Sequence, residues 1–473
     1  MEQVYVRDLV EATGGILLKG NPEKAVSKIR LDSRQVEAGD LFVPIIGERV
    51  DGHRFIPQVI LAGAAVVLTS EHEAEDVEKW CEEQDGNACA EQASWIRVHD
   101  TKEALQNIGR YLRGRLSLPL VGVTGSVGKT TTREMIAAAL SAKYHVYKTP
   151  GNSNSQVGVP ITISEITKKD EVGVIELGMS EPGELTVIAK IAKIDMAVIT
   201  NIGITHIEQL GSRENIYKEK MTIQDGLKDD GVLILNGDDD MLCNTKGKPG
   251  VTTIYYGTGE NCDFRAEEIN LNDGAAKFVA VHGDERQYVE LGVMGMHNVM
   301  NALAAIAVCS QSGMTMEEAA SGLKTFHGFK GRQQIFAGDH LTILDDSYNA
   351  SPASMKASLD VFKTLKPGHR HVAVLADMKE LGDLVREYHH EIGVHAVSAG
   401  VDVIVTLGEA CHFLAEGARS VSDIPVAEFL DKQEMMAYLE ANLKHGDCIL
   451  FKGSNSMGLS AVAAHFVDKA GLE

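Results

Sequence analysis

The most informative part of this sequence is Thr124-Gly125-Ser126-Val127-Gly128-Lys129-Thr130-Thr131-Thr132, which lies between an apolar run and a helical pattern. The short apolar run 119–123 precedes it and predicts a buried strand. Residues 133–140 follow it and predict a helix, because their apolar side chains recur on one face. A glycine-rich turn between a strand and a helix points backbone N–H groups and the positive end of the helix at an anion. The order of strand, turn and helix therefore predicts that this stretch binds a triphosphate.

Individual residues of the turn suit this chemistry. Gly125 and Gly128 can adopt the positive φ angles that such a turn requires. Lys129 can reach the β- and γ-phosphates of a nucleotide, and the Thr130 hydroxyl can hold Mg²⁺. The match to the general phosphate-loop pattern is incomplete, since Val123 stands where that pattern has its first glycine. The alternative is an ordinary turn with a solvated lysine, which the combination of Gly, Lys and Thr in this context disfavours.

The composition indicates a multidomain globular protein with an excess of acidic residues. The chain has 473 residues, enough for about two to four domains, and its 44% hydrophobic and 24% charged residues are typical of a globular protein. The net charge of −22 argues against a nucleic-acid-binding surface, which requires clustered Lys and Arg. Attraction for phosphate must therefore come from local N–H groups, from Lys129 and from Mg²⁺ rather than from the overall field.

The cysteines and the apolar runs predict where the protein works. Seven cysteines are scattered without a C-x-x-C pair or a zinc-like spacing, so we expect reduced thiols in a cytoplasm. Residues 1–8 show no secretory signal pattern. No apolar run approaches the roughly 20 residues that span a bilayer. We therefore expect a cytoplasmic protein that neither inserts into a membrane nor binds nucleic acid.

The order of strand and helix patterns divides the chain into three α/β blocks, which we place at 1–117, 118–329 and 330–473. Alternation of strands and helices predicts mostly parallel sheets that bind ligands at the carboxyl ends of their strands. The expected elements are strands at 41–44, 64–68, 172–177, 196–200, 232–236, 341–345, 371–375, 403–406 and 448–451, a surface loop at 82–91, a β-rich segment at 251–293, a helix at 298–311 and a hinge at 327–332.

Three residues of the second block are candidates for catalysis. Glu176 ends a strand near the phosphate loop, where a carboxylate suits Mg²⁺, although a solvent-facing glutamate is an equal alternative. His206 follows the next strand and would project from the same rim of the sheet, although a lone histidine is more often structural. Lys220 lies in a predicted helix, 212–226, which Ser212 caps. Composition alone predicts that Lys220 is a solvated helix lysine.

Further candidate ligands lie in turns and at the start of a helix. Asn152 belongs to a turn-rich loop that either grips polar substrate groups or is simply a structured turn. Asn298 and Asn301 open a helix, and they either cap it or contact a base edge. Arg332 lies at the predicted hinge and Asp346 follows the first strand of the third block, and each could equally be a surface charge.

Together these motifs resemble those of the Mur ligases, the ATP-dependent amide-forming enzymes of bacterial peptidoglycan precursor synthesis. The resemblance covers essentially the whole chain. Segments 31–34, 39–44 and 51–56 look like the uridine-nucleotide domain of that family. Segment 124–132 is similar to the family's own phosphate loop, which accounts for Val123.

The resemblance implies three α/β domains: a central parallel-sheet domain with a phosphate loop that binds ATP, an N-terminal α/β domain for a uridine nucleotide, and a C-terminal Rossmann-like α/β domain. It also implies Mg²⁺ at two sites and a carbamylated Lys220. The implied ATP contacts are Thr124, Gly125, Ser126, Val127, Gly128, Lys129, Thr130, Thr131, Asn298, Arg332 and Asp346; the substrate contacts are Ser33, Arg34, Asn152, Asn349 and Ser351; the catalytic residues are Lys129, Glu176, His206 and Lys220; and the metal residues are Thr130, Glu176, His206 and Lys220.

Segments 346–352 and 376–382 resemble the family members that add a dipeptide. The implied substrates are UDP-N-acetylmuramoyl-tripeptide and D-alanyl-D-alanine, joined through an acyl phosphate. The Asp-Asn-Pro-Arg motif of the diaminopimelate-adding members is absent, while Ser155 and Asn455 depart from the family pattern. Residues 349–352 also read as a turn that begins a helix, and we expect the Asn349 amide and the Ser351 hydroxyl to be free for the dipeptide.

We further expect a monomer. The alternatives are a sister Mur ligase or folylpolyglutamate synthase that adds another amino acid, or a non-catalytic nucleotide-binding regulatory module.

Overall fold

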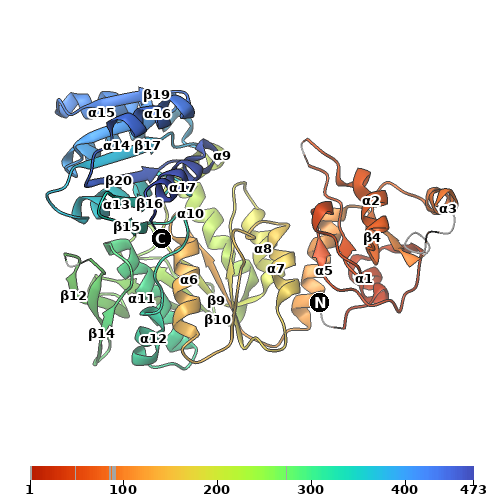
Figure 1. Ribbon diagram of the computed structural model, residues 1–473. Helices are drawn as coiled ribbons and strands as arrows, with labels where there is room; N and C mark the ends of the chain where they lie inside the picture. Colours follow the sequence, from red (N-terminus) through yellow and green to blue (C-terminus); the bar gives the residue numbers. More distant parts are fainter. Residues whose placement is uncertain (1–2, 48, 85–86, 88–91, 273, 473) are drawn as a thin grey trace.

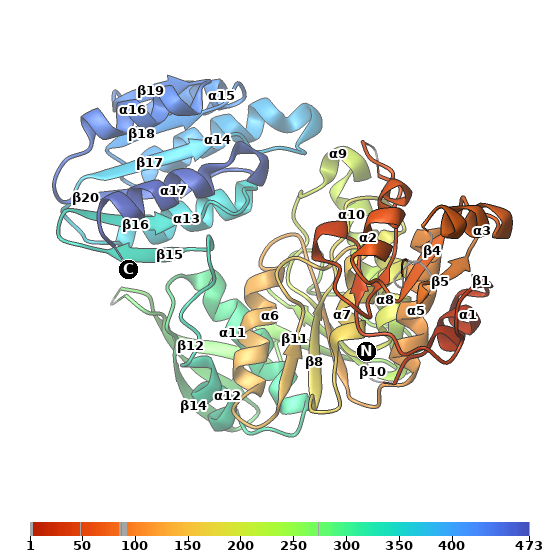
Figure 2. The same ribbon diagram turned by 45° about the vertical axis from the view of Figure 1, so that its right-hand side comes forward.

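Three separate β-sheets organise the chain into three α/β units (Figure 1). The structure is a computed structural model, and it describes residues 3–47, 49–84, 87, 92–272 and 274–472. The N-terminal unit, coloured red to orange, and the C-terminal unit, coloured blue, lie on either side of the central unit (Figures 1 and 2). The three-domain α/β architecture is therefore confirmed, while the boundaries between the domains stay predictions.

The N-terminal sheet has five strands in the order β1-β5-β4-β3-β2. Strand β1 pairs antiparallel with β5, and the other neighbours pair in parallel. Residues 82 and 83 of the loop expected at 82–91 belong instead to the end of helix α3. Residues 85, 86 and 88–91 lie outside the described part of the chain. The elements are α1 (Val6–Thr13), β1 (Ile16–Lys19), β2 (Ile29–Arg30), η1 (Ser33–Gln35), β3 (Leu41–Phe42), η2 (Gly52–Phe55), α2 (Ile56–Leu61), β4 (Val66–Thr69), α3 (Ala74–Glu83), β5 (Ser94–Arg97) and α5 (Thr101–Gly114).

The central sheet has nine strands in the order β14-β13-β12-β11-β10-β9-β6-β8-β7. From β7 at one edge to β12, neighbouring strands of this sheet pair in parallel. Strand β13 pairs antiparallel with both β12 and β14, so the pairing changes from parallel to antiparallel within the β-rich segment after residue 251. The strands are β6 (Leu120–Thr124), β7 (Val146–Lys148), β8 (Val172–Glu176), β9 (Ile194–Ile199), β10 (Leu227–Asn236), β11 (Thr252–Gly257), β12 (Phe264–Asn270), β13 (Lys277–His282) and β14 (Glu285–Glu290).

Helices cover both faces of the central sheet because successive strand residues point to opposite sides. Val174 packs in one core with residues of α6 and α11, whereas Ile175 packs in a second core with residues of α7 and α8. The helix predicted at 212–226 is two elements, an α-helix and a 3₁₀ turn. The helical elements are α6 (Lys129–Leu140), α7 (Gly158–Glu165), α8 (Glu184–Ala192), α9 (Ile207–Leu210), α10 (Arg213–Met221), η3 (Thr222–Gly226), α11 (Met296–Gln311) and α12 (Met316–Leu323).

The C-terminal sheet has six strands in the order β15-β16-β20-β17-β18-β19. Its neighbours pair in parallel, apart from β15, which pairs antiparallel with β16. The elements are β15 (Gln334–Ala337), β16 (Leu341–Asp345), α13 (Pro352–Thr364), β17 (His371–Ala376), η4 (Gly382–Leu384), α14 (Val385–Ser398), β18 (Val403–Leu407), α15 (Cys411–Val421), β19 (Val426–Phe429), α16 (Lys432–Asn442), β20 (Asp447–Lys452), η5 (Asn455–Met457) and α17 (Leu459–Lys469).

The carboxyl ends of the parallel strands carry most of the predicted site residues. Strands β6 and β8 of the central sheet end at Thr124 and Glu176, and β16 of the C-terminal sheet ends just before Asp346. Within the described residues, no helix is both long and apolar enough to cross a bilayer. The cysteines that the structure describes are free thiols.

Candidate active site

A cavity of about 600 Å³ lies between the central and the C-terminal domains. The phosphate loop forms one wall, and the loop after β16 forms another. Of the predicted site residues, the cavity is lined by Ser126, Val127, Gly128, Lys129, Thr130, Thr131, Asn152, Glu176, His206, Asn298, Arg332, Asp346, Asn349 and Ser351. Thr124 and Gly125 lead directly into the lining segment, whereas Lys220, Ser33 and Arg34 are outside the lining.

The phosphate loop has the conformation that its glycines allow. Gly125 and Gly128 have φ angles of +149° and +85°. A Cβ atom on Gly125 would lie 1.8 Å from the Thr200 hydroxyl oxygen, so a larger residue cannot fit there. Asn201 contacts the loop directly, since its Oδ1 accepts a hydrogen bond from the Val127 N–H at 2.9 Å. The loop is therefore rigidly fixed to the end of β9, and Asn201 is a loop-holding residue that sequence reasoning missed.

Lys129 begins helix α6 and bends back over the loop. Its Nζ donates a hydrogen bond to the Gly125 carbonyl at 2.8 Å. Burial lowers the pKa of Lys129, while the nearby Glu176 carboxylate raises it. The Lys129 side chain therefore lies against the phosphate loop. The alternative of an ordinary turn with a solvated lysine is wrong.

Glu176 is a buried carboxylate at the end of β8. It is 2% exposed, so the solvent-facing alternative is wrong. Its Oε1 accepts a hydrogen bond from Asn154 Nδ2 at 2.7 Å, and its Oε2 accepts one from Arg133 Nη1 at 3.1 Å. Arg133 is also buried and donates to the Gly151 carbonyl at 2.8 Å, which ties Glu176 to the turn-rich loop beside Asn152. Sequence reasoning missed Asn154 and Arg133, because an arginine on a helix face gives no signal that it is buried.

Lys220 is buried, and its prediction as a solvated lysine is wrong. Ser212 caps helix α10 as predicted, but Lys220 points inward and is 1% exposed, whereas the Lys218 side chain is 65% exposed. Among the described residues Lys220 has no hydrogen bond and no ion pair. Burial, followed by the charge of Lys129, holds the pKa of Lys220 well below its usual range. The structure therefore favours a neutral amine here, close to the phosphate loop.

His206 meets a carboxylate from the other domain. Its Nδ1 lies 2.7 Å from Glu380 Oε2, and this contact links the central domain to the loop after β17. Both residues have left-handed backbones, with φ angles of +65° and +64°, a conformation that costs free energy for any residue other than glycine. The ion pair with His206 lowers the pKa of Glu380. Sequence reasoning noted segment 376–382 without foreseeing this contact.

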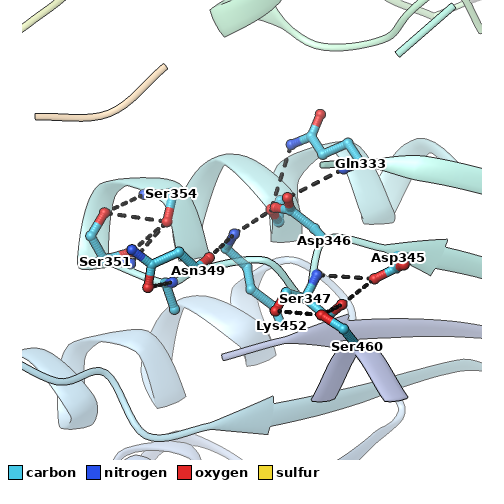
Figure 3. A network of polar contacts seen from close by, with 11 residues as sticks. Gln333, Asp345, Asp346, Ser347, Asn349, Ser351, Ser354, Lys452 and Ser460 are labelled. Atoms are coloured by element: carbon cyan, nitrogen blue, oxygen red, sulfur yellow. Dashed lines mark hydrogen bonds and ion pairs between the residues drawn. The ribbon is translucent and has the colours of Figure 1, made fainter. Parts of the chain in front are cut away.

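The C-terminal wall of the cavity is a network of polar contacts around Asp346 (Figure 3). The Asp346 carboxylate accepts hydrogen bonds from the Gln333 N–H at 3.2 Å and from the Ser358 hydroxyl, and its Oδ2 lies 2.5 Å from Lys452 Nζ. It is therefore a fixed, buried group and not a surface charge. The Arg332 guanidinium carbon lies 4.2 Å from the centre of the Tyr348 ring, and the Arg332 Nε is buried with no hydrogen-bond partner among the described residues.

The turn at 349–352 begins helix α13, as predicted. Ser351 is its N-cap residue, and the Ser351 hydroxyl both accepts from the Ser354 N–H and donates to the Ser354 hydroxyl. The prediction that this hydroxyl is free was wrong, because a serine before a helix satisfies the first N–H groups of that helix. The Asn349 side chain uses only its Oδ1, which accepts from the Ala350 N–H at 2.9 Å, so its amide N–H groups bond to no other described residue.

Asn298 and Asn301 link helix α11 to the phosphate-loop helix. Asn298 Nδ2 donates to the Met294 carbonyl at 2.7 Å, and Asn301 Nδ2 donates to Asn298 Oδ1 at 3.2 Å. Asn301 Oδ1 in turn accepts from the Thr132 hydroxyl at 2.9 Å. Gly295 occupies the cap position, so neither asparagine is the helix cap. Asn298 is nevertheless part of the cavity wall.

Ser33 and Arg34 lie in the N-terminal domain, away from this cavity. Both belong to the 3₁₀ turn η1. The Arg34 side chain is 83% exposed and pairs with Asp32 at 2.6 Å. Hydrogen bonds from Arg34 lower the pKa of Asp32 to about 2. The structure thus does not bring these two residues to the phosphate loop.

Two other groups of potential metal ligands are already satisfied by protein contacts. His389 lies beside Asp377 and Cys411, but its Nε2 accepts from the Met378 N–H and its Nδ1 bonds to the Val385 carbonyl. His53 lies beside Asp51 and Glu71, and its Nε2 accepts from the Ser70 N–H. The other ring nitrogen of His53, Nδ1, lies 2.7 Å from Asp51 Oδ1.

Three family models match successive parts of the chain. The model for the Mur ligase family catalytic domain matches residues 25–112, that for the Mur ligase middle domain matches residues 123–309, and that for the Mur ligase glutamate ligase domain matches residues 331–455. These matches follow the three sheets in order.

Relatives of known name and structure match the whole length. The UDP-N-acetylmuramoyl-tripeptide--D-alanyl-D-alanine ligase of Bacillus subtilis strain 168 is 36% identical over 98% of this chain and 98% of its own length. The crystal structure of MurF from Acinetobacter baumannii is 30% identical, has a TM-score of 0.87 and covers 98% of each chain. The MurF ligase of Thermotoga maritima in complex with ADP is 27% identical, with a TM-score of 0.80, over 94% of this chain and 98% of that one. With its three domains, its phosphate loop and these full-length matches, the chain belongs to the Mur ligase family.

Proposed function

We propose that this protein is an ATP-dependent ligase that adds D-alanyl-D-alanine to UDP-N-acetylmuramoyl-tripeptide in peptidoglycan synthesis. One observation carries the proposal: a single cavity holds the phosphate loop on one side and the 346–351 loop of another domain on the other side. The names of the full-length relatives support the same reaction. The products are the UDP-linked pentapeptide, ADP and phosphate.

The reaction has two steps in one cavity. A carboxylate oxygen of the tripeptide attacks the γ-phosphorus of ATP, the bond from that phosphorus to the bridging oxygen breaks, and ADP leaves an acyl phosphate behind. The neutral amine of the dipeptide then attacks the acyl carbon, the C–O bond to phosphate breaks, and the amine loses a proton. Lys129 neutralises charge on the phosphoryl oxygens, which is the main requirement of this chemistry. Arg332, whose Nε has no hydrogen-bond partner among the described residues, supplies a second cation from the opposite wall.

We propose Mg²⁺ at two places. We assign the Thr130 hydroxyl and the Glu176 carboxylate to one, because hard cations prefer oxygen ligands, and we assign His206 and a modified Lys220 to the other. Bound there, Mg²⁺ supplies charge neutralisation for the triphosphate. Glu176 is preset for its role because Asn154 and Arg133 fix its carboxylate.

Lys220 becomes a metal ligand only if its charge is reversed. Its Nζ would attack the carbon of CO₂, forming an N–C bond and releasing one proton, to give a carbamate with two oxygen donors. That reaction requires a neutral amine, and the burial of Lys220 without any partner supplies one. We therefore propose that Lys220 is carbamylated in the active protein.

The substrates are assigned to different domains. We place the uridine nucleotide on the N-terminal domain with Ser33 and Arg34, the tripeptide end near Asn152, and the dipeptide at the loop after β16. The free amide of Asn349 is a suitable donor for the dipeptide, while Ser351 contributes the shape of the turn rather than its hydroxyl.

A phosphate-release assay tests the function. The purified protein would be given ATP, Mg²⁺ and the UDP-tripeptide, with D-alanyl-D-alanine, lysine, diaminopimelate or no amine. We expect phosphate release coupled to pentapeptide formation only with the dipeptide, because residues 349–352 carry no charged side chain that could pair with a distal ammonium group. Turnover with a single basic amino acid and none with the dipeptide would point to a sister ligase, and the absence of turnover with all donors would point to a regulatory module.

A further inference from the structure

Lys452 is a buried lysine whose hydrogen-bond partners belong to one loop. It ends strand β20, and its side chain is 2% exposed. Its Nζ lies 2.5 Å from Asp346 Oδ2 and donates a hydrogen bond to the Asn349 carbonyl at 3.2 Å. Figure 3 shows the Lys452 side chain extended between these two residues. One ammonium group thus joins the carboxylate assigned to ATP and the residue assigned to the dipeptide.

The sheet register places Lys452 at this position. Strands β16 and β20 are parallel neighbours, with Asp345 opposite Phe451. Lys452, the next residue of β20, therefore lies beside the loop that follows β16. Its long side chain reaches both Asp346 and Asn349 of this loop. Removing an ammonium group from water is costly unless an anion and a hydrogen-bond acceptor replace the water, and Asp346 and Asn349 supply both.

The contacts of Lys452 determine what Asp346 can offer to a ligand. An ionised carboxylate has about four acceptor positions. Three are taken, by the Gln333 N–H, the Ser358 hydroxyl and Lys452 Nζ. The remaining position is available to a group in the cavity that Asp346 lines. Lys452 also compensates the negative charge of Asp346, which would otherwise repel the phosphates of ATP.

We propose that Lys452 is a positioning residue that couples the ATP-facing and the dipeptide-facing parts of the cavity, an inference that rests on the proposed function. Without its ammonium group, Asp346 is a buried charge without a cationic partner and the loop at Asn349 is no longer tied to β20. Both substrates that meet this loop lose affinity, and the UDP-tripeptide, bound by another domain, does not.

The test compares two variants of Lys452 with a matched control. Lys452→Gln removes the positive charge. Lys452→Arg keeps the charge on a planar guanidinium, which suits the Asp346 carboxylate better than it suits the Asn349 carbonyl. Arg370→Gln is the control, since it breaks a partly buried pair with Asp447 at the opposite end of β20. For each protein, kcat, the KM of each of the three substrates and the Tm are measured in the full-length chain.

We expect Lys452→Gln to raise the KM for D-alanyl-D-alanine and for ATP by roughly tenfold or more, with the KM for the UDP-tripeptide unchanged. Lys452→Arg should recover the KM for ATP and keep a raised KM for the dipeptide. Arg370→Gln should lower the Tm and leave all three KM values unchanged.

Unchanged KM values for the dipeptide in both Lys452 variants would overturn the inference, as would an equal rise of all three KM values in the Lys452 variants and the control. If Lys452→Gln does not fold, Lys452→Arg decides by the same criterion. A wild-type protein without dipeptide turnover would overturn the proposed function and this inference with it, whereas normal turnover with unaffected variants would overturn the inference alone.

Discussion

Replacing Lys220 by methionine separates the chemical role of this residue from its structural role. Methionine has a similar length and no amine, so Lys220→Met removes the group that reacts with CO₂ and keeps the buried volume. Among the residues that the structure describes, the Lys220 side chain has no hydrogen bond and no ion pair to lose, and it is 1% exposed. The variant should therefore fold normally.

We expect Lys220→Met to keep or gain stability and to lose activity. A buried polar group without a partner costs roughly 1–3 kcal/mol, so Lys220→Met should be as stable as the wild type or more stable by up to about that amount. Activity should fall by at least about 100-fold, because a ligand that orients the reacting phosphate is lost. Lys218→Met is the matched control on the same helix, since the Lys218 side chain is exposed and pairs with Glu214 at the helix surface.

The assay combines turnover, unfolding and spectroscopy. Pentapeptide formation and the urea unfolding midpoint are measured for the wild type and both variants. Isotopically labelled bicarbonate should give a carbamate carbon signal in the NMR spectrum of the wild type and of Lys218→Met, and none in Lys220→Met. In Lys220→Ala, which leaves space beside the site, added formate or acetate should restore part of the activity.

Two results would refute this reasoning. If Lys220→Met kept more than about a tenth of the wild-type activity, the amine would not be needed for catalysis. If Lys220→Met unfolded at a much lower urea concentration than Lys218→Met, Lys220 would have a stabilising partner that the structure does not contain, and the argument for its neutral amine would fail.

Three further changes have distinct expected results. Lys129→Ala should raise the barrier to ligation by roughly 3–4 kcal/mol, with calorimetry showing nearly unchanged binding of the UDP-tripeptide; near-normal ligation would contradict the assignment of the phosphate loop. Asn349→Ala should raise the KM for the dipeptide more than the KM for ATP, and the reverse order would place Asn349 on the nucleotide side. Arg34→Ala should raise the pKa of Asp32 from about 2 toward its ordinary value of 3.8, measured by NMR titration, because the folded protein loses the hydrogen bonds that favour the carboxylate; the contribution of this pair to stability is thus present above pH 3.8 and lost as the pH falls toward 2. An Asp32 pKa that does not move would mean that Arg34 is not its partner in solution.

The phosphate loop was predictable because its signal is local. Its glycines, Lys129 and the strand and helix on either side lie within a short stretch, and each adopts the conformation that its own sequence favours. The same holds for the turn at 349–352, where Ser351 and Pro352 mark the start of α13. The sequence could not predict whether the Ser351 hydroxyl caps the helix or contacts a ligand, because a serine is suited to both roles.

The misassigned Lys220 shows where local signals end. Lys218 and Lys220 are two residues apart on a short helix with charged residues on several faces, and nothing in that stretch distinguishes the inner lysine from the outer one. Their environments differ because α10 packs on α8, a contact that the tertiary fold creates. The pairing of Lys452 with Asp346 joins residues 106 positions apart, so it depends on which strands of the C-terminal sheet are neighbours. Single-residue chemistry in this site is therefore determined by long-range packing, while the position of the site is determined by local sequence.

The acidic composition and the anionic substrates are reconciled at Lys129. The net charge of −22 gives no general attraction for a triphosphate, so binding depends on the few cations and N–H groups of the cavity. Burial lowers the pKa of Lys129, and its present acceptor is the neutral Gly125 carbonyl. A triphosphate that replaces this carbonyl supplies the negative charge that favours the protonated lysine. We therefore propose that ATP binding and the protonation of Lys129 reinforce each other, so that the positive charge assigned to catalysis is largest when the nucleotide is in place.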